Sequence, residues 1–305
     1  MRRAVLGVDA GGTHTRALVL AGEGRTGMGQ AGPANWTTLG PERCAHAIAE
    51  AAGLALRAAG APASALARVC VSMAGFYPPW HEAEARAAIS AALPGPSLSL
   101  VPDLIAAWAG ATGGSAGVVL VAGTGAVAYG RDSAGRAARA GGWGPLYGDE
   151  GGGYWIGCEA LRAISRALDG RGPVTSLVEV VALGEESLRA VYRDAWSREQ
   201  VAALCVAVAR HAAAGDAVAA GILAHAAAEL GALVAAVARR LSWGSEPLPV
   251  SAVGGVISAG PPLRRPLERW LAAVLPHARW RAPLGSPLEG ALLLAQKREL
   301  RCRTS

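Results

Sequence analysis

Short apolar runs that end at glycine or at an acidic residue recur along the first third of the chain. Runs of about four to eight apolar residues bounded by turn residues predict buried β-strands. The first run ends at Asp9, and the glycines after it predict a turn into a second strand. In this part of the chain we expect strands over residues 4–8, 15–22, 24–32, 67–75 and up to about Val101.

Alanine-rich segments with helical spacing separate the later strands. Pro41 opens one that extends to about Ala59, because proline is favoured in the first turn of a helix. A second helix is expected over residues 80–92, and a third begins at Asp103, whereas residues 32–40 predict a loop. Three strands followed by alternating helices and strands indicate an α/β domain.

The second half of the chain repeats this pattern. A buried strand from residue 117 ends in the turn Gly123-Thr124-Gly125, a second strand runs to residue 130, and residues 136–142 supply a third. Internal repetition predicts two similar domains, whose turns would face each other and hold one polyphosphate from both sides. Further on, we expect helices over residues 152–168, 185–194, 197–213, 215–242 and 286–300, and a buried strand with a Gly-Gly turn within 248–260.

The predicted fold class is therefore α/β, with two domains and a cleft between them. The first domain is expected over residues 1–112, and the C-terminal helix, within residues 286–305, would pack back on it. Residues 113–285 would form a larger second domain with helical insertions. A chain of 305 residues is also long for one core.

The turn after the first strand carries residue types that suit a phosphate site. Gly11 and Gly12 can adopt positive φ and let a ligand approach the backbone, and the hydroxyls of Thr13 and Thr15 lie alongside. Asp9 alone would repel phosphate, so its place at the strand end predicts a divalent cation, Mg²⁺, held through water. The alternative is a glycine hairpin with a solvated aspartate, because short glycine motifs are weak signals.

Residues 141–157 contain eight glycines and two tryptophans, which no ordinary strand or helix would contain. Trp143 offers an apolar face to a sugar ring, and the adjacent acids Asp149 and Glu150 accept hydrogen bonds from hydroxyls. The loop therefore predicts a sugar site. Its alternative is a structural glycine loop in front of a helix.

Asp103 stands where a strand gives way to a helix, a position that often lines ligand sites in α/β folds. It can act as a general base that takes the proton from an attacking hydroxyl, with Asp149 as the second candidate. The alternative for Asp103 is a helix N-cap. Asn35 and Trp36 form another polar and aromatic pair for a sugar pocket, and loop packing is the alternative for Trp36.

Composition narrows these possibilities. The chain is 52% hydrophobic and 17% charged, which is typical of a folded soluble protein. No apolar run is expected to span a membrane, and no signal-peptide core follows the N-terminus, so a cytoplasmic protein is predicted. The formal charge is +6, but the basic residues are spread along helices, so nucleic acid is not expected as a partner.

Lysine and cysteine usage excludes several classes of site. Lys297 is the only lysine, so a Walker A loop, which needs a lysine after its glycines, is absent. The five cysteines are scattered without a CxxC pair, which argues against a zinc site and against a disulfide framework.

Several stretches, taken together and in this order, resemble the motifs of a known family. They are DAGGTHT, GPANW, VPDLIAA, VAGTG, GGWGPLYGDEGGGYWIG, AVGGVIS and PLEGALLLA, and they extend over nearly the whole chain. They look like the BadF/BadG/BcrA/BcrD-type ATPase family, in particular its amino-sugar kinase branch. The resemblance implies an actin-like ATPase fold of duplicated ribonuclease H-like domains that close on MgATP.

The resemblance also implies roles for individual residues. Asp103 would be the general base, and Asp9 would organise Mg²⁺. ATP would be held by Gly11, Gly12, Thr13, Thr15, Gly123, Thr124 and Gly125, with Gly254, Gly255 and Ser258 against the adenosine. The sugar site would be shaped by Asn35, Trp36, Asp103, Trp143, Gly144, Asp149 and Glu150. This chain departs from the family pattern at His14, where lysine is common, and at Ala126, where serine is common.

The function predicted from these features is the ATP-dependent phosphorylation of the 6-hydroxyl of N-acetylglucosamine or a related amino sugar, by a homodimer. Glucosamine is an alternative substrate. A second class of function is an ATPase that activates a partner dehydratase or reductase, which would need cysteines that bridge an iron–sulfur cluster. A third is a sugar-binding regulator without catalysis.

Overall fold

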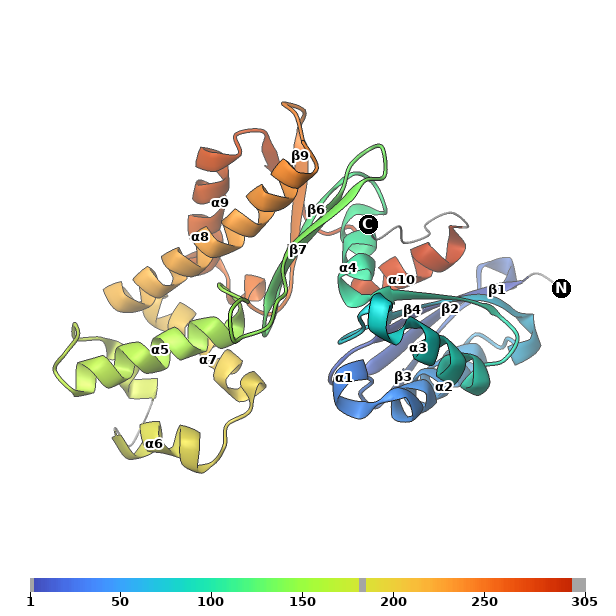
Figure 1. Ribbon diagram of the computed structural model, residues 1–305, viewed down its shortest axis with the longest axis horizontal. Helices are drawn as coiled ribbons and strands as arrows, with labels where there is room; N and C mark the ends of the chain where they lie inside the picture. Colours follow the sequence, from blue (N-terminus) through green and yellow to red (C-terminus); the bar gives the residue numbers. More distant parts are fainter. Residues whose placement is uncertain (1–2, 181–184, 298–305) are drawn as a thin grey trace. The chain divides into compact units, whose positions relative to one another are not determined.

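The computed structural model describes residues 3–180 and 185–297, and it divides the chain into two compact units (Figure 1). Unit 1 comprises residues 1–115 and 283–305, and unit 2 comprises residues 116–282. Each unit contains a five-stranded mixed sheet and its own buried apolar core. The C-terminal segment thus returns to the unit in which the chain begins.

The sheet of unit 1 has the strand order β3-β2-β1-β4-β5. β1, β2 and β3 are antiparallel neighbours, whereas β4 and β5 run parallel to β1. The strands are β1 (Ala4–Ala10), β2 (Thr15–Leu20), β3 (Thr26–Ala31), β4 (Leu66–Met73) and β5 (Ser97–Pro102). The helices are α1 (Trp36–Leu39), α2 (Pro41–Ala58), α3 (Pro78–Ala92), α4 (Asp103–Thr112) and α10 (Pro287–Gln296), with 3-10 turns at Gly22–Gly24 and Ala63–Ala65.

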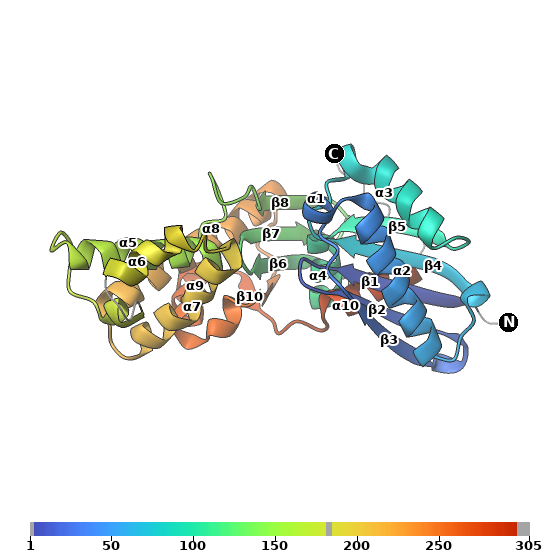
Figure 2. The ribbon, with the colours of Figure 1, turned by 90° about the horizontal axis from the view of Figure 1, so that it is seen from below.

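Glycines let helices pack closely on both faces of this sheet. A Cβ on Gly7 of β1 would overlap the backbone of Leu292 in α10. On the opposite face, a Cβ on Gly29 of β3 would overlap the carbonyl oxygen of Ala51 in α2. α2 therefore covers one face of the sheet, and α10 covers the other, packed against α4 (Figure 2).

The sheet of unit 2 has the strand order β10-β9-β6-β7-β8. β6, β7 and β8 are antiparallel neighbours, whereas β9 and β10 run parallel to β6. The strands are β6 (Gly117–Ala122), β7 (Ala126–Arg131), β8 (Ala137–Gly141), β9 (Leu248–Val253) and β10 (Ala278–Trp280). The helices are α5 (Gly153–Leu168), α6 (Glu185–Arg193), α7 (Arg198–Ala213), α8 (Ala217–Arg240) and α9 (Pro261–Val274), with 3-10 turns at Ser176–Val180 and Ile257–Ala259.

The two sheets have the same topology. β6, β7, β8, β9 and β10 take the places of β1, β2, β3, β4 and β5 in both order and direction. The repetition predicted from the sequence is therefore present in the fold. The units differ in the connection between the third and fourth strands, because four helices, α5 to α8, lie between β8 and β9 in unit 2.

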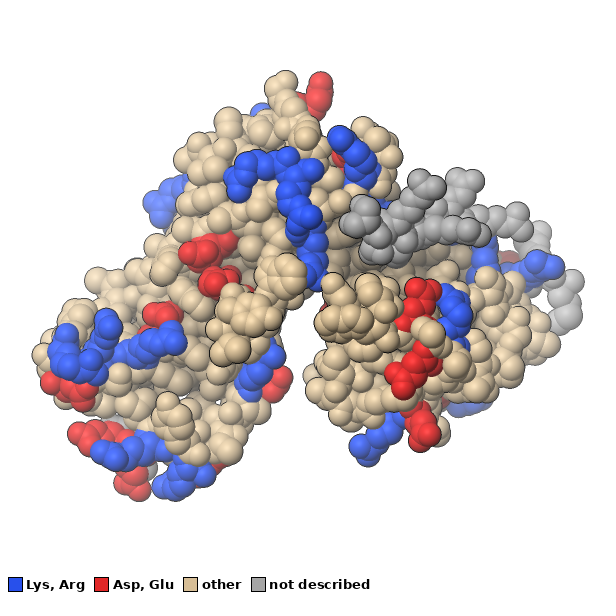
Figure 3. Space-filling view, in the orientation of Figure 1, with Lys and Arg blue, Asp and Glu red and all other residues tan. Residues whose placement is uncertain are grey.

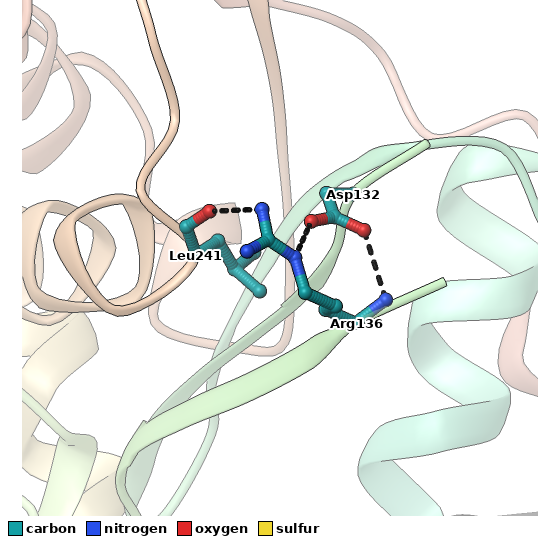
Figure 4. A network of polar contacts seen from close by, with 3 residues as sticks. All are labelled: Asp132, Arg136 and Leu241. Carbon is teal, nitrogen blue, oxygen red and sulfur yellow. Dashed lines mark hydrogen bonds and ion pairs between the residues drawn. The ribbon is translucent and has the colours of Figure 1, made fainter. Parts of the chain in front are cut away.

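In both sheets, an arginine in the hairpin between the second and third strands donates to a carbonyl oxygen at the end of a helix. In unit 2, Arg136 donates to both carboxylate oxygens of Asp132, at 2.6 and 2.8 Å, and to the carbonyl oxygen of Leu241 at 3.0 Å (Figure 4). Leu241 is the C-cap of α8. In unit 1, Arg25 donates to the carbonyl oxygen of Gly60, just after α2, at 3.2 Å. Each hairpin is thereby tied to the end of a long helix packed on its sheet.

The fold differs from the sequence-based expectation at α1, at α9 and at the short strand β10, which was not expected. Residues 32–40 contain the one-turn helix α1, because the side chain of Asn35 accepts from the N–H of Thr37 and caps it. The helix α9 was not expected; it carries prolines at its first two positions and Pro266 inside. The last helix is described to Gln296, and the expected extension beyond residue 297 lies outside the described residues.

α8 corrects the expectation that no segment is long and apolar enough to span a membrane. Among the described residues it alone meets that criterion by length and composition. Its apolar residues contribute to the core of unit 2, where Leu223, Leu230 and Val234 are almost fully buried. Core helices pass the same test, so packing accounts for the apolar character of α8.

On the face seen in Figure 3, basic and acidic side chains are interspersed over both units.

Candidate functional site

The turn between β1 and β2 exposes its backbone and polar side chains. The N–H of Gly11 donates to the carbonyl oxygen of His14 at 3.0 Å, which closes the turn. Gly12, Thr13 and His14 are exposed, and Asp9 lies half-buried at the end of β1. The turn thus presents N–H and hydroxyl donors to solvent, as an anion site requires.

Glycine at this turn is not explained by backbone conformation. Neither Gly11 nor Gly12 has a positive φ, so that part of the expectation was wrong. A Cβ on Gly11 would stand 3.0 Å from the carbonyl oxygen of His14, whereas a Cβ on Gly12 would meet nothing within 4 Å. Nothing in the described fold therefore requires glycine at position 12, which is expected if a ligand must approach the backbone there.

Thr15 does not belong to this exposed surface. Its side chain is fully buried, and its hydroxyl has no hydrogen-bond partner among the described residues. In the strand alternation of β2, Thr15 faces the side opposite to Arg16. The expectation that Thr15 holds phosphate is therefore not supported by its position, whereas Thr13 keeps an exposed side chain.

Asp103 lies at the same edge of the sheet as Asp9. β1, β4 and β5 are parallel, with Asp9 opposite Ser72 and Ser72 opposite Val101, so their carboxyl ends meet at one edge. Asp103 is the first residue of α4 rather than its N-cap, which is Pro102. Its carboxylate accepts from the N–H of Leu104 at 2.8 Å.

Both carboxylates are electrostatically perturbed. Although Asp103 is partly exposed, loss of hydration in its surroundings raises its pKa to about 6; the Leu104 N–H opposes this shift, and the negative charge of Asp9 adds to it. Burial likewise raises the pKa of Asp9, and the nearby charge of Arg16 acts in the opposite direction. A carboxyl group with a pKa near 6 is mostly ionised at neutral pH and still basic enough to accept a proton.

A cavity of about 460 Å³ opens beside Asp9 within unit 1. It is lined by Arg16 and Gln30 from the neighbouring strands and by Ser286 and Pro287 at the start of α10. No motif in the sequence pointed to these residues. Arg16 and Gln30 could have been found from strand alternation alone, because both face the same side of the sheet as Asp9.

The turn between β6 and β7 is supported by the start of α5. The N–H of Gly123 donates to the carbonyl oxygen of Gly125 at 3.0 Å. The carbonyl oxygens of Gly123 and Thr124 accept from the N–H groups of Gly153 and Tyr154, at 2.8 and 3.0 Å. A Cβ on Gly123 would meet nothing within 4 Å, and its φ is not positive, so the fold does not require glycine there either.

Asp149 packs directly on this turn. A Cβ on Gly125 would stand 2.5 Å from a carboxylate oxygen of Asp149, so glycine makes room for that side chain. The carboxylate is buried, accepts from the N–H of Ala126 at 3.4 Å and lies 3.6 Å from Arg198. Arg198 is distant in sequence, and no sequence signal pointed to it. Asp149 also has a φ of +63°, in the left-handed region that residues other than glycine adopt only where the surrounding structure holds them there.

The glycine–tryptophan loop exposes the ring of Trp143, whereas Trp155 packs against the core of unit 2. Trp143 is 60% exposed, and the guanidinium of Arg139 lies 4.7 Å from the centre of its ring. Gly141, Gly142 and Gly144 have positive φ, which explains glycine at these positions. Glu150 is half-buried next to Asp149. The loop therefore holds an exposed indole and two acids within unit 2.

Asn35 and Trp36 have different surroundings in the fold, so only Asn35 keeps polar groups available to a ligand. Trp36 is 3% exposed and packs edge-on against Phe76 in the core of unit 1, so the expectation that it lines a sugar pocket is corrected in favour of packing. The side-chain oxygen of Asn35 accepts from the N–H and hydroxyl of Thr37, at 3.1 and 2.9 Å. Its amide N–H groups remain as donors for a ligand.

The turn after β9 also contains one glycine that the fold requires and one that it does not. Gly254 has a φ of +111°, and a Cβ there would overlap the carbonyl of Ala122. A Cβ on Gly255 would meet nothing within 4 Å. Ser258 is exposed, and its hydroxyl donates to the carbonyl oxygen of Gly254 at 3.4 Å.

Comparison with known proteins bears on these observations. The chain is 36% identical to an N-acetylmuramic acid/N-acetylglucosamine kinase of Clostridium acetobutylicum over 165 residues, which are 52% of this chain and about half, 54%, of that protein. It is 29% identical over 309 residues to an N-acetyl-D-glucosamine kinase of Dictyostelium discoideum, covering 95% and 97% of the two chains. A solved structure of a candidate N-acetylglucosamine kinase from Chromobacterium violaceum superposes with a TM-score of 0.77 at 30% identity, covering 97% and 99%.

The fold extends to more distant proteins. A hexokinase from Schistosoma mansoni superposes with a TM-score of 0.61 at 14% identity, covering 97% of this chain and 86% of that one, which shows the fold alone. The two-domain α/β fold is thus that of actin-like ATPases, as predicted. The model of the BadF/BadG/BcrA/BcrD ATPase family matches residues 6–295, and the chain belongs to that family.

Proposed function

We propose that this protein transfers the γ-phosphoryl group of ATP to the 6-hydroxyl of N-acetylglucosamine or of a closely related amino sugar. Use of ATP follows from the family, and a sugar as acceptor follows from the kinases to which the chain is similar. The position of attack and the identity of the amino sugar are proposals. The observation that supports phosphoryl transfer to a hydroxyl is the exposed carboxylate of Asp103, which lies at the same sheet edge as the open turn after Asp9.

Asp103 would act as the general base. With a pKa of about 6 it is ionised at neutral pH, so it can orient the attacking hydroxyl and accept its proton as the phosphoryl group transfers. Asp149 is the second candidate from the sequence. Its carboxylate is buried and already contacts Arg198 and the N–H of Ala126, which favours a role in holding the sugar rather than in moving a proton.

Phosphate oxygens would be held by the exposed backbone around Gly11 and Gly12, by the hydroxyl of Thr13, and by the turn Gly123-Thr124-Gly125. Gly12 and Gly123 support this role, because the fold itself does not require glycine at either position. Gly254, Gly255 and Ser258 would lie against the adenosine. Thr15 is left out of this proposal because it is fully buried.

The oxygen atoms near Asp9 fit a hard divalent cation. Asp9 and Asp103 place two negative charges close enough for one to raise the pKa of the other, and Mg²⁺ prefers carboxylate oxygens and water. Asp9 would hold it through water. When bound, Mg²⁺ neutralises charge on the transferred phosphoryl group. Among the described residues no cluster of three or more metal-binding side chains exists, which is compatible with a cation shared with ATP.

The sugar would be contacted by the exposed ring of Trp143, by the backbone at Gly144 and by the acids Asp149 and Glu150. The amide of Asn35 would add a hydrogen-bond donor. Trp36 contributes only indirectly, through the packing that supports Asn35.

A role as an iron–sulfur activator of a partner enzyme is not supported by any cysteine arrangement in the described structure. Cys44, Cys70 and Cys205 are buried, and Cys158 is half-buried on α5. No group of three metal-binding side chains is found within residues 3–180 and 185–297. Assembly as a homodimer, a cytoplasmic location and the absence of a nucleic-acid partner stay predictions, the first of which light scattering would test.

The experiment that tests the proposal measures ADP release from MgATP against N-acetylglucosamine, glucosamine, N-acetylmannosamine, N-acetylmuramic acid, glucose and no sugar. We expect release that depends on one amino sugar, and a ³¹P spectrum of the product that shows a 6-phosphomonoester. A product phosphorylated elsewhere on the ring would overturn the position of attack. Release that is equal in all tubes, or absent from all, would overturn the sugar kinase itself.

Matched variants connect the activity to the site. Asp103→Asn should abolish sugar-dependent release, whereas Asp194→Asn, a change to an exposed aspartate paired with Arg193, should leave it unchanged. Retained turnover in Asp103→Asn would exclude Asp103 as the general base and leave Asp149 as the remaining candidate.

A further inference from the structure

Unit 1 contains a second cavity, of about 500 Å³, at the opposite end of the sheet from Asp9. It lies at the amino ends of β1, β4 and β5 and at the carboxyl end of α10. Among the described residues that line it, three are cationic, Arg3, Arg68 and Lys297, and none is acidic. The described lining of the cavity is therefore positively charged.

Arg68 occupies an unusual position for a charged residue. It lies on β4, the fourth strand in the order β3-β2-β1-β4-β5, with Val5 of β1 and Ser97 of β5 as its cross-strand neighbours. Its register places it on the same face as Gly7, against which α10 packs. Arg68 is half-buried and has neither an ion pair nor a side-chain hydrogen bond among the described residues.

No guanidinium nitrogen of Arg68 is among the buried polar atoms that lack a partner, so the group stays accessible to solvent and to a ligand although the residue is half-buried. A guanidinium that loses part of its hydration needs an opposite charge or acceptors to compensate. Arg68 has five N–H donors in a planar fork, which matches the oxygens of a phosphate group. The half-buried arginine is therefore suited to bind an anion that enters the cavity.

Hydroxyl groups complete the surroundings of Arg68. Ser97 and Ser99 lie two residues apart on β5 and therefore project on the same side of the sheet as Arg68. Both can donate to an oxygen anion. Lys297 has a second role available, since its Nζ lies next to Gly114, close to the C-terminal end of α4, where a positive charge is favourable. Arg68 has no such alternative partner among the described residues.

We propose that this cavity is a binding site for the phosphate group of a small phosphorylated metabolite. Two arginines, Arg3 and Arg68, and two serine hydroxyls in one cavity suit a doubly charged phosphate monoester better than a single carboxylate. The site is separate from the turns proposed to hold ATP, because Val5 and Asp9 stand at opposite ends of β1. The inference does not depend on the sugar kinase activity.

Calorimetric titration of the full chain in the absence of nucleotide tests this site. The ligands are inorganic phosphate, a sugar 6-phosphate, the same sugar without phosphate, and sulfate. The wild-type protein should bind the sugar phosphate more tightly than inorganic phosphate, and it should not bind the free sugar at this site. Equal binding of sulfate, inorganic phosphate and the sugar phosphate would mean an adventitious ion only, and would overturn the proposal.

Variants locate the bound phosphate. Arg68→Gln should weaken binding at least tenfold, and Arg68→Lys, which keeps the charge but loses the fork, should weaken it less. Arg43→Gln, a change to an exposed arginine on α2 outside the cavity, should have no effect. Thr13→Ala should also leave this binding intact. If Thr13→Ala removed the binding and Arg68→Gln kept it, the anion would occupy the turn after Asp9, and the proposed site would be wrong.

The folding of each variant is checked before its binding is compared. Near-ultraviolet circular dichroism and the thermal midpoint of each variant are measured first. Because Arg68→Gln removes a charge without a described partner, its midpoint without ligand should equal or exceed that of the wild type. Phosphate should raise the midpoint of the wild type and of Arg43→Gln but not of Arg68→Gln. An equal rise in all three would overturn the proposal.

Discussion

The turns at the ends of β1 and β6 occupy the same place in two sheets of the same topology, yet they obtain their acidic residues differently. In unit 1 the acid is local, because Asp9 ends the strand that leads into the turn. In unit 2 the strand position that pairs like Asp9 is Val121. There the acid is Asp149, which lies in the loop between β8 and α5 and packs on Gly125.

This difference separates two kinds of glycine. A Cβ on Gly12 or Gly123 would meet nothing within 4 Å, so the fold does not require glycine there. Gly125 instead makes room for a side chain of the protein itself. One sequence pattern of glycine and threonine thus leaves open backbone in both units and serves internal packing in only one.

The largest expected effect comes from neutralising one acid in each unit. Asp103→Asn should lower kcat roughly 10²- to 10⁴-fold, the range for loss of a general base, with little change in nucleotide affinity. Asp149→Asn should raise the KM for the sugar more than it lowers kcat. Steady-state ADP release and binding of a non-hydrolysable ATP analogue check both. A larger loss of kcat in Asp149→Asn would reverse the roles assigned to the two acids.

The next effect compares the two kinds of glycine. Gly125→Ala should displace Asp149 and lower the free energy of unfolding by about 1–3 kcal/mol, as overpacking does. Gly12→Ala should change it by less than about 0.5 kcal/mol, since its Cβ meets nothing, yet it should weaken ATP binding about tenfold. Urea unfolding and nucleotide titration measure the two quantities. Equal loss of stability in both variants would contradict the distinction.

The pH dependence of the rate gives a third comparison. Since the pKa of Asp103 is raised to about 6, its basic form is lost as the pH falls through that value, and kcat/KM should fall about tenfold per pH unit below it. The charge of Asp9 contributes to the raised pKa, so Asp9→Asn should move this acidic limb to lower pH. Asp149→Asn should leave the limb in place. A limb that does not move in Asp9→Asn would remove the coupling within unit 1.

The smallest effect concerns the two hairpin arginines. Arg136→Gln in unit 2 and Arg25→Gln in unit 1 each remove hydrogen bonds between a hairpin and the end of a helix. Because both side chains are exposed, each change should cost at most about 1 kcal/mol of the free energy of unfolding. Chemical unfolding measures it. The loss in Arg136→Gln should be the larger, because Asp132 also loses the bond from the guanidinium and keeps only that from the backbone N–H of residue 136.

Residues close together in sequence could be predicted well. The strand, turn and second strand around Asp9, and the repeat of that pattern around Thr124, are local and depend on a few apolar and glycine residues. The start of α4 at Asp103 was expected for the same reason. α9 was not predicted, although proline is well accepted in the first turn of a helix, where two of its prolines lie.

Burial could not be predicted residue by residue. Thr15 and Trp36 belong to motifs that suggested ligand contact, yet both side chains are buried, because strand alternation and the packing of Phe76 on Trp36 decide where they point. The approach of Arg198 to Asp149, and of Arg68 to the end of α10, joins residues far apart in the chain. No local pattern encodes such contacts.

By itself the sequence determined the α/β class, the duplication, the two glycine turns and the family, since each depends on short-range patterns or on the order of motifs. Only the tertiary structure decided that Asp149 supports Gly125, that Asp9 raises the pKa of Asp103, and that an arginine without a described partner lines a second cavity. The physical reason is that hydration and charge act through space. The chain brings each set of groups together only when its own unit has folded.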